Sequence, residues 1–273
     1  MNGIIAVASS ELRIAIRNRW VLISIVMMTL FALVLSAAGS APTGHLGADK
    51  LSITVASLTS LAVYLVPLVA LLMSFDAIAG EVERGTLPLA LAYPISRSEI
   101  LAGKLLAHLG VLSLAVATGY AIAAVAAFAL DDQAARGLPA LARLFWTSVF
   151  LGAAFLGGGY AISALSRRPG TAAGIAIALW LIAIVLYDLA LLAAVVADSG
   201  GTFTQSIFPW MLVANPADAF RLFNLSMSEA TAAAGGIAGA ANSISPDLAL
   251  VSLMAWPLAA FALAASFFRR VTP

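Results

Sequence analysis

The sequence lacks cysteine altogether and has only two histidines, His45 and His108. The absence of cysteine excludes disulfides, thiolate metal sites and iron–sulfur clusters. The two histidines fall near opposite membrane surfaces in the topology set out below, so they cannot face one another as the axial ligands of a buried haem. No serine–histidine pair lies at a similar depth, as an intramembrane serine protease would require.

Charged residues are also scarce, at 10% of the 273 residues, whereas hydrophobic residues make up 62%. A soluble domain carries about 25% charged residues. The mean hydropathy of +1.04 indicates that the solvent for most of the chain is lipid. Lipid offers no hydrogen-bond partners to the backbone, so the predicted class is all-α.

Six apolar stretches are long enough to cross a bilayer as helices, which takes about 20 residues each. They are residues 20–38, 54–75, 105–130, 144–165, 171–197 and 248–268. The first is too long for the apolar part of a cleavable signal peptide. We therefore predict a polytopic protein with a single transmembrane domain over residues 1–273.

The distribution of Lys and Arg predicts that both termini are cytoplasmic. This orientation places ten of these residues on the inner side and four on the outer side, as the positive-inside rule requires. In residues 1–18, Ile5, Ala8, Leu12 and Ile16 share one helical face. This pattern predicts an interfacial amphipathic helix on the cytoplasmic surface; the alternative is a short basic tail that only fixes the topology.

Small residues recur every four positions in three spans, which lets helices approach closely. They are Gly119, Ala123 and Ala127, then Ala153, Gly157 and Ala161, then Gly170, Gly174 and Ala178. These stripes indicate compact packing and nothing more specific.

The second inner segment, residues 76–104, predicts a short helix that projects from the cytoplasmic face. Gly85 ends the helix that leaves the membrane, and Thr86 caps a short apolar helix that Tyr93 and Pro94 end. Ser96 and Glu99 form a capping box for the next helix. Such a helix suits a groove on a soluble partner; the alternative is an ordinary loop packed on its own spans.

This segment resembles the cytoplasmic signature of ABC-2 type transporter permeases. The resemblance is carried by Glu83-Arg84-Gly85-Thr86-Leu87, Tyr93-Pro94-Ile95-Ser96-Arg97, Glu99-Ile100 and Gly103-Lys104. It implies an ABC-2 permease fold in the bacterial inner membrane, whose coupling segment docks on a cytoplasmic ABC ATPase. The residues expected at that contact are Glu81, Glu83, Arg84, Gly85, Thr86, Leu87, Leu89, Tyr93, Pro94, Arg97, Glu99 and Lys104.

The chain itself has no phosphate-binding loop, because no glycine stands five residues before Gly103. No cofactor is therefore expected in this chain, and ATP and magnesium are expected in the partner ATPase. Six spans are few for a transport pathway, so we expect a second copy of the chain and two ATPase copies.

The last outer loop, residues 198–247, predicts two short helices at the outer surface. Asn215 suits an N-cap, Pro216 the first helical position and Asp218 the positive helix end. A second helix is predicted from the Ser226 to Glu229 capping box. Aromatic residues of this loop are expected either to anchor it at the headgroups or to meet a periplasmic partner; they are Phe208, Trp210, Phe220 and Phe223.

The stretch Asn215 to Leu222 resembles the permeases of this family that serve nitrous oxide reductase maturation. The resemblance implies a periplasmic copper-handling partner and a role in assembling the copper site of that reductase, in denitrification. The residues expected to contact the partner are Asn215, Pro216, Asp218, Phe220, Arg221 and Phe223.

Asp188 is a charge within the fifth span, and ionisable residues inside membranes are functional candidates. The alternative is an interfacial residue of a span that ends early. Met211, Met227 and His45 lie on the outer side, and thioethers suit Cu(I). They lack a tight repeated spacing, so no metal site and no catalytic residue is predicted.

The sequence therefore predicts a permease subunit, not an enzyme, that couples ATP hydrolysis in a separate subunit to transport or force transmission. The alternatives are an ABC-2 exporter of drugs, lipids or ions, and a membrane scaffold subunit that has no ATPase.

Overall fold

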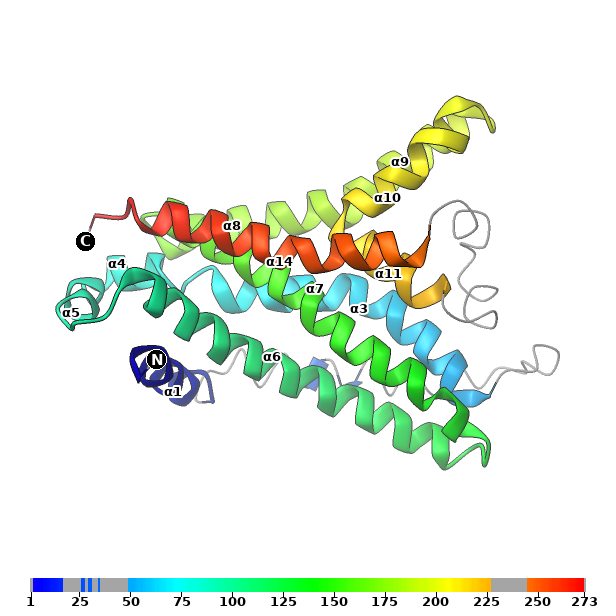
Figure 1. Ribbon diagram of the computed structural model, residues 1–273, viewed down its shortest axis with the longest axis horizontal. Coiled ribbons are helices and arrows are strands. Elements are labelled where there is room, and N and C mark those ends of the chain that lie inside the picture. The colour runs from blue at the N-terminus through cyan, green and yellow to red at the C-terminus, as the bar shows by residue number, and fades with distance from the viewer. Residues whose placement is uncertain are drawn as a thin grey trace.

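The computed structural model describes residues 2–16, 49–226 and 245–272, together with residues 26, 27, 29, 30 and 34. Within these ranges the chain is helical and contains no strand. The long helices run side by side along one axis (Figure 1). The first predicted span, residues 20–38, lies largely outside the described residues.

Five helical stretches of the described residues are long and apolar enough to cross a membrane. They contain α3 (Lys50–Ser74), α6 (Arg97–Phe128), α7 (Leu138–Leu165), the continuous run of α8 (Pro169–Trp180), η2 (Leu181–Leu186) and α9 (Tyr187–Asp198), and α14 (Pro246–Phe268). Helix α6 begins eight residues before the apolar stretch that predicted it, because the capping box of Ser96 and Glu99 starts the helix outside that stretch.

Helix α7 is central and packs against α3 on one side and α14 on the other. The most apolar window of α3 is 67% buried, whereas those of the α8–α9 run and of α14 are only 17% buried. Gly157 permits the close approach of α7 and α14, since a Cβ atom there would lie 2.8 Å from the Cβ of Ala260. The α8–α9 run and α14 thus form the least covered side of the chain.

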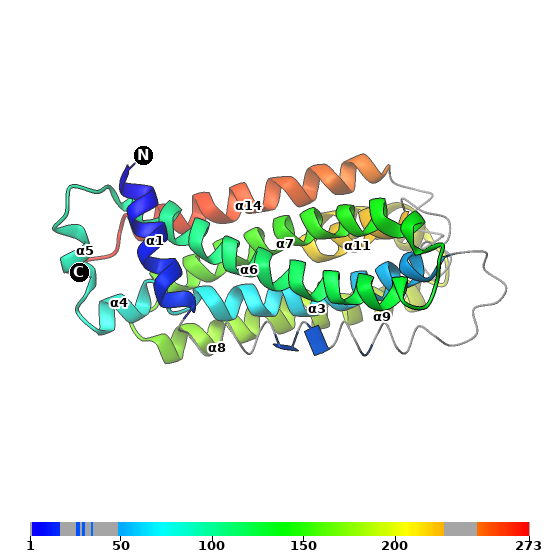
Figure 2. The same cartoon turned by 90° about the horizontal axis from the view of Figure 1, so that it is seen from below.

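Several segments that are distant in sequence gather at one end of the bundle, which we call the α5 end (Figure 2). They are α1 (Asn2–Ile16), α4 (Ala79–Glu83), α5 (Leu87–Leu91) and the C-terminal residues after α14. Helix α1 crosses the long axis of the bundle and packs on α6. Gly103 makes this contact possible, because a Cβ atom there would lie 2.6 Å from the Cβ of Val7.

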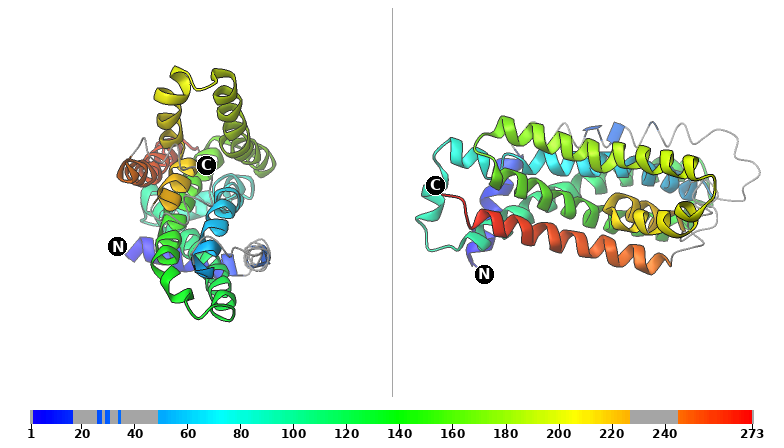
Figure 3. Two further views of the ribbon diagram at one scale, coloured as in Figure 1. Left: turned by 90° about the vertical axis from the view of Figure 1, so that its right-hand side faces the viewer. Right: turned by 90° about the horizontal axis from the view of Figure 1, so that it is seen from above.

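At the opposite end, η1 (Ala134–Gly137) leads into α7, and α9 is followed by a re-entrant hairpin. This hairpin consists of η3 (Phe203–Ile207), α10 (Phe208–Ala214) and α11 (Pro216–Ser226). Figure 3 shows α9 and α10 standing together to one side, with α11 among the long helices. The hairpin tip reaches Phe155, Ala183 and Trp256, near the middle of three long helices.

The prediction that a helix starting at Pro216 lies on the outer surface is therefore wrong in its position, although α11 does begin at that residue. The helix is inside because its side chains pack on α3, α7 and α14. The second helix predicted for this loop, starting at Ser226, falls outside the described residues.

Candidate functional site

Residues 76–104, which we call the coupling segment, leave the bundle through a turn whose backbone conformation favours glycine. Gly85, which follows the C-cap residue Arg84 of α4, has φ of +67°, a conformation that side chains disfavour. Leu87 is fully buried and anchors α5, whereas Leu89 and Tyr93 are each 67% exposed. Leu89 on α5 and Tyr93 just after it are therefore exposed at the α5 end of the bundle.

Two of the predicted caps in this segment differ in outcome. The capping box is present, with the backbone N–H of Ser96 donating to Glu99 Oε2 at 2.9 Å. Thr86 does not cap α5; its hydroxyl instead donates to the carbonyl of Glu81 at 3.3 Å. The reason is that Thr86 already has helical backbone angles, which turn its side chain away from the first N–H groups.

Ser163, near the end of α7, holds the start of the coupling segment in place. Its Oγ accepts hydrogen bonds from the backbone N–H groups of Ile78 and Ala79, both at 2.9 Å. Ile78 precedes α4 and Ala79 is its first residue, so both N–H groups lie at a helix start, where partners within the helix are missing. Ser163 carries no sequence signal for this role, because serine is common in transmembrane helices.

Lys104 on α6 lies at the centre of a buried ionic cluster. Its side chain is 3% exposed, and its Nζ donates to Glu11 on α1 and to Glu81 Oε1 on α4 at 2.7 Å. We call Glu11, Glu81 and Lys104 the Lys104 cluster. It joins α1, the coupling segment and α6, and its formal charge is −1. Sequence reasoning identified Glu81 and Lys104 but missed Glu11, whose 93-residue separation from Lys104 leaves no local pattern.

Arg97 connects the start of α6 to the C-terminal end of α14. Its Nη1 donates to the carbonyls of Phe268 and Val271, both at 2.7 Å. The guanidinium also lies 5.6 Å from the centre of the Phe268 ring, within the range of a cation–π contact. The guanidinium of Arg97 is thus bound by residues of this chain, at the C-terminal end of α14.

The remaining expected coupling residues lie on the outside of the segment. Arg84 forms an exposed ion pair with Asp76 at 3.4 Å, a kind of pair that stabilises a fold little. Glu83, Gly85, Thr86 and Pro94 are also exposed. The expected contact surface is thus available to a partner, whereas Leu87 and Lys104 support it from within.

The tip of the hairpin is bound to the middle of the α8–α9 run. Asn215 donates its side-chain Nδ2 to the carbonyl of Ala183 at 2.7 Å, and its Oδ1 accepts the N–H of Ala217 at 2.9 Å. The second bond is the N-cap expected from the sequence. Ala183 lies within η2, a π-helical turn that interrupts the regular ladder of the span.

Asp188 is paired, and its partner is a residue that the sequence placed at the outer surface. Arg221 Nη2 donates to Asp188 Oδ2 at 2.8 Å, and its Nη1 lies 3.4 Å from Asp218 Oδ1. Asp218 is 2% exposed. Two carboxylates therefore share one guanidinium between α9 and α11.

The far end of α11 is bound to α7. Asn224 donates to Thr147 Oγ1 at 3.0 Å, and the ring of Phe223 meets the edge of Trp146 with 5.8 Å between centroids. Of the six residues expected to contact a periplasmic partner, Asn215, Pro216, Asp218, Phe220 and Phe223 are buried and Arg221 is half-buried. Contact with such a partner stays a prediction, and it requires either Arg221 or a movement of the hairpin.

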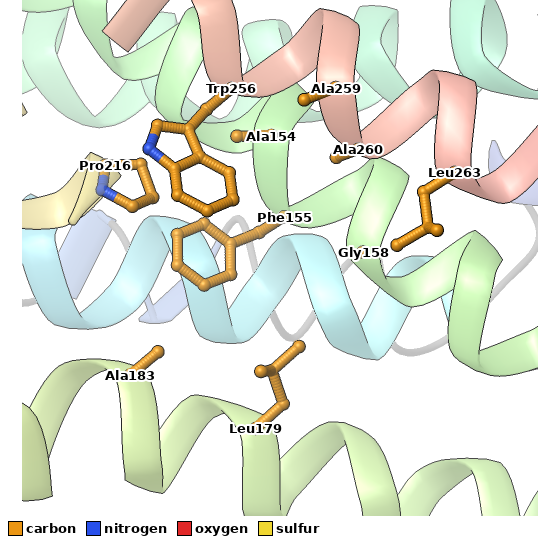
Figure 4. A pocket seen from close by; sticks show the side chains of 10 residues that line it. All are labelled: Ala154, Phe155, Gly158, Leu179, Ala183, Pro216, Trp256, Ala259, Ala260 and Leu263. Carbon is orange, nitrogen blue, oxygen red and sulfur yellow. The ribbon is translucent and has the colours of Figure 1, made fainter. Parts of the chain in front are cut away.

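An apolar cavity of about 320 Å³ lies where the hairpin tip meets α7, α8 and α14 (Figure 4). Phe155, Pro216 and Trp256 form one part of its wall, and two leucines, Leu179 and Leu263, together with alanine and glycine residues form the rest. In the ranges that the structure describes, no group of three or more His, Asp and Glu side chains could hold a metal ion. The Met211 carbonyl accepts a bond from Tyr187, whereas His45 and Met227 lie outside the described residues.

Comparisons with known proteins agree with the arrangement of long apolar helices and a projecting segment. The family model described as ABC-2 family transporter protein matches residues 5–272. The chain is 42% identical over 268 residues to the probable ABC transporter permease protein NosY of Pseudomonas aeruginosa, covering 97% of both chains. It is 38% identical over 274 residues to the protein of the same name from Stutzerimonas stutzeri, covering 99% of both. The chain therefore belongs to the ABC-2 family of transporter permeases, as a multi-pass membrane subunit.

Proposed function

We propose that this chain is the membrane half of an ATP-driven machine and that α5 is the element its cytoplasmic ATPase grips. The observation that carries the proposal is the contrast within α5, where Leu87 is fully buried but Leu89 is 67% exposed. A helix anchored in this way presents an apolar contact and transmits a push to the bundle behind it. ATP and magnesium bind in the ATPase, and the α5 end faces the cytoplasm.

The contacts behind α5 suggest where such a push travels. The Lys104 cluster couples α4 to α1 and α6, and the two bonds of Ser163 couple the same segment to α7. Helix α7 packs on α14 and α11, so displacement at α5 reaches the re-entrant hairpin through packed helices. Substrate passage, or force delivered to an outer partner, is the output of this movement.

The working unit is proposed to be a homodimer with two ATPase subunits. The α8–α9 run is the most apolar of the five candidate spans and among the least buried. A Cβ atom at Gly170 or Gly174 would meet nothing within 4 Å, unlike one at Gly157. This face of small residues is open to a second copy. Gly174→Leu is expected to weaken dimerisation in detergent, and Gly110→Leu, also in open space, is its matched control.

The outer partner is proposed to be a periplasmic copper-handling protein, and the process to be copper-site assembly of nitrous oxide reductase. Support comes from the segment Asn215 to Leu222 and from the similarity to proteins named NosY. Most charged residues of the described spans lie toward the span ends; the two that lie farther in and form ion pairs are Lys104 and Asp188, and Asp188 pairs with Arg221 of α11. This arrangement favours force transmission over passage of a free ion.

Association with the ATPase tests the proposal. The chain and its cognate ATPase are purified together, and the dissociation constant and ATP hydrolysis are measured with Leu89→Asp and with Glu83→Gln, a change at a second residue expected at the contact. Leu89→Asp is expected to weaken association at least about tenfold, equivalent to about 1.4 kcal/mol, and to remove coupled hydrolysis. Equal affinity of Leu89→Asp and the unaltered chain would contradict docking through α5, and a chain that binds no ATPase would be a scaffold subunit.

A second candidate is export of a hydrophobic drug or lipid. The apolar cavity of about 320 Å³ at the hairpin tip favours it. The two functions differ in the cell: loss of the chain removes the reductase copper site in the first case and leaves it intact in the second.

A further inference from the structure

A pocket of about 450 Å³ opens between α1 and the coupling segment at the α5 end. Ser10 and Glu11 line it from α1, and Ala90 and Tyr93 line it from the side of α5. The Lys104 cluster lies along it, since Glu11, Glu81 and Lys104 are all lining residues.

The charges of this pocket do not balance. Lys104 supplies one positive charge, whereas Glu11 and Glu81 supply two negative charges. Glu81 Oε1 is paired with Lys104, but the other oxygen, Glu81 Oε2, is buried and has no hydrogen-bond partner among the described residues. A buried carboxylate oxygen without a donor is costly. The missing group is a donor, and a cationic donor would also neutralise the cluster.

We propose that this pocket receives a lysine or arginine side chain carried by the ATPase. The proposal rests on the proposed function, since it names the chemistry that the ATPase brings to α5. The walls suit such a side chain, because Val7, Ile14 and Ala90 can cover its aliphatic stem while its charged end reaches the Lys104 cluster. An acidic side chain would meet a net negative charge, and an apolar one would leave Glu81 Oε2 without a donor.

A side chain in this position would contact α1 and the coupling segment at once. Helix α1 would then be part of the ATPase contact and would move with α5. An interfacial helix can be held at the membrane surface by lipid alone. A shared ATPase contact explains why α1 is in addition joined to the coupling segment through the buried Lys104.

Single-cysteine labelling can test the pocket because the chain has no cysteine. Ser10→Cys places a thiol in the pocket, and Ser9→Cys, which is also exposed but does not line the pocket, is the matched control. Each variant is treated with an aminoethyl and a sulfonatoethyl methanethiosulfonate, which carry opposite charges. The rates are measured for the chain in nanodiscs, with and without its ATPase.

The ratio of the reaction rate with the cationic reagent to that with the anionic reagent is expected to be several-fold higher for Ser10→Cys than for Ser9→Cys. The ATPase should slow the Ser10→Cys reaction at least about tenfold and leave Ser9→Cys unchanged. Adding Glu81→Gln should remove the preference for the cationic reagent and reduce protection. Lys104 keeps Glu11 as its partner in the Glu81→Gln variant. Ala90→Leu is a second variant, which narrows the pocket without changing its charge and should also reduce protection.

Two outcomes separate this proposal from the proposed function. In the first, Leu89→Asp releases the ATPase, but the ATPase either does not protect Ser10→Cys or protects it equally when Glu81→Gln or Ala90→Leu is added. The pocket then does not receive a cation, and docking through α5 stands. If the unaltered chain binds no ATPase, the proposed function fails, and the intrinsic charge preference of Ser10→Cys then reports on the pocket alone.

Discussion

Asn215 donates its side-chain amide to the carbonyl of Ala183 across 2.7 Å, which joins the tip of the re-entrant hairpin to the middle of a membrane span. The span contains the π-helical turn η2 at this point, and such turns recur at functional sites. The same side chain caps α11 through Ala217. One residue therefore sets both the depth of the hairpin and the start of its second helix.

Replacement of Asn215 should loosen the hairpin in two separable steps. Asn215→Ala removes both bonds and is expected to lower the free energy of unfolding by about 1–2 kcal/mol. Asn215→Ser keeps a cap for α11 but is too short to reach Ala183, so its loss should be smaller. Thermal unfolding in detergent gives the order, and equal stability of Asn215→Ala and the unaltered chain would show that the hairpin is held by packing alone.

The two carboxylates around Arg221 predict an unequal response to mutation. Arg221→Leu leaves Asp188 and Asp218 close together without a cation and is expected to destabilise the chain by about 3 kcal/mol. Asp188→Asn leaves Arg221 with Asp218 and balances the charge, so it should cost clearly less. Chemical unfolding of both variants tests this order, and the reverse order would mean that Asp218 contributes no charge to the site.

Gly103 is expected to be intolerant of any side chain. A Cβ atom there would lie 2.6 Å from Val7 Cβ and 2.9 Å from the carbonyl of Ile4, so Gly103→Ala should push α1 away from α6 and weaken ATPase association. Gly110→Ala on the same helix meets nothing within 4 Å and should stabilise α6 by about 0.5–1 kcal/mol. Accessibility of a cysteine at Ser9 or Ser10 reports the position of α1; unchanged accessibility in Gly103→Ala would contradict the packing.

Asp131 is expected to make the end of α3 at Lys50 sensitive to acid. Its carboxylate accepts the backbone N–H groups of Lys50 and Gln133, both at 2.8 Å, and these bonds lower the pKa of Asp131. A lowered pKa stabilises the fold above the unfolded value of about 3.9, and this stabilisation is lost as the pH falls through the folded value.

The protection factor of the Lys50 amide, by which its exchange is slowed relative to an unstructured chain at the same pH, should therefore fall below about pH 4. Asp131→Asn should remove this acid dependence, because the amide does not titrate in this range. The same fall in protection in both proteins would assign the acid sensitivity to another group.

Local features of the fold could be predicted from the sequence. The capping box of Ser96 and Glu99, the stop at Gly85 and the start of α11 at Pro216 all depend on residues a few positions apart. Hydropathy likewise located the five described spans, since a helix in lipid needs a continuous apolar run.

The hairpin could not be predicted in the same way. Pro209 and Pro216 interrupt its apolar runs, and Asp218 and Arg221 look like surface residues until Asp188, 33 positions before Arg221, is placed beside them. The Lys104 cluster is similar, because Glu11 and Glu81 approach Lys104 only after α1 and α4 have folded onto α6. Such pairings depend on tertiary contacts that no short pattern encodes.

The depth of the hairpin tip at Asn215 affects the thickness of the water-free barrier across this protein. A bilayer core is about 30 Å thick, and the tip contacts Ala183 near the middle of a span that runs from Pro169 to Asp198. If the hairpin swings outward, water can follow its polar side chains to that level. The remaining dry barrier would then be roughly half a membrane, about 15 Å.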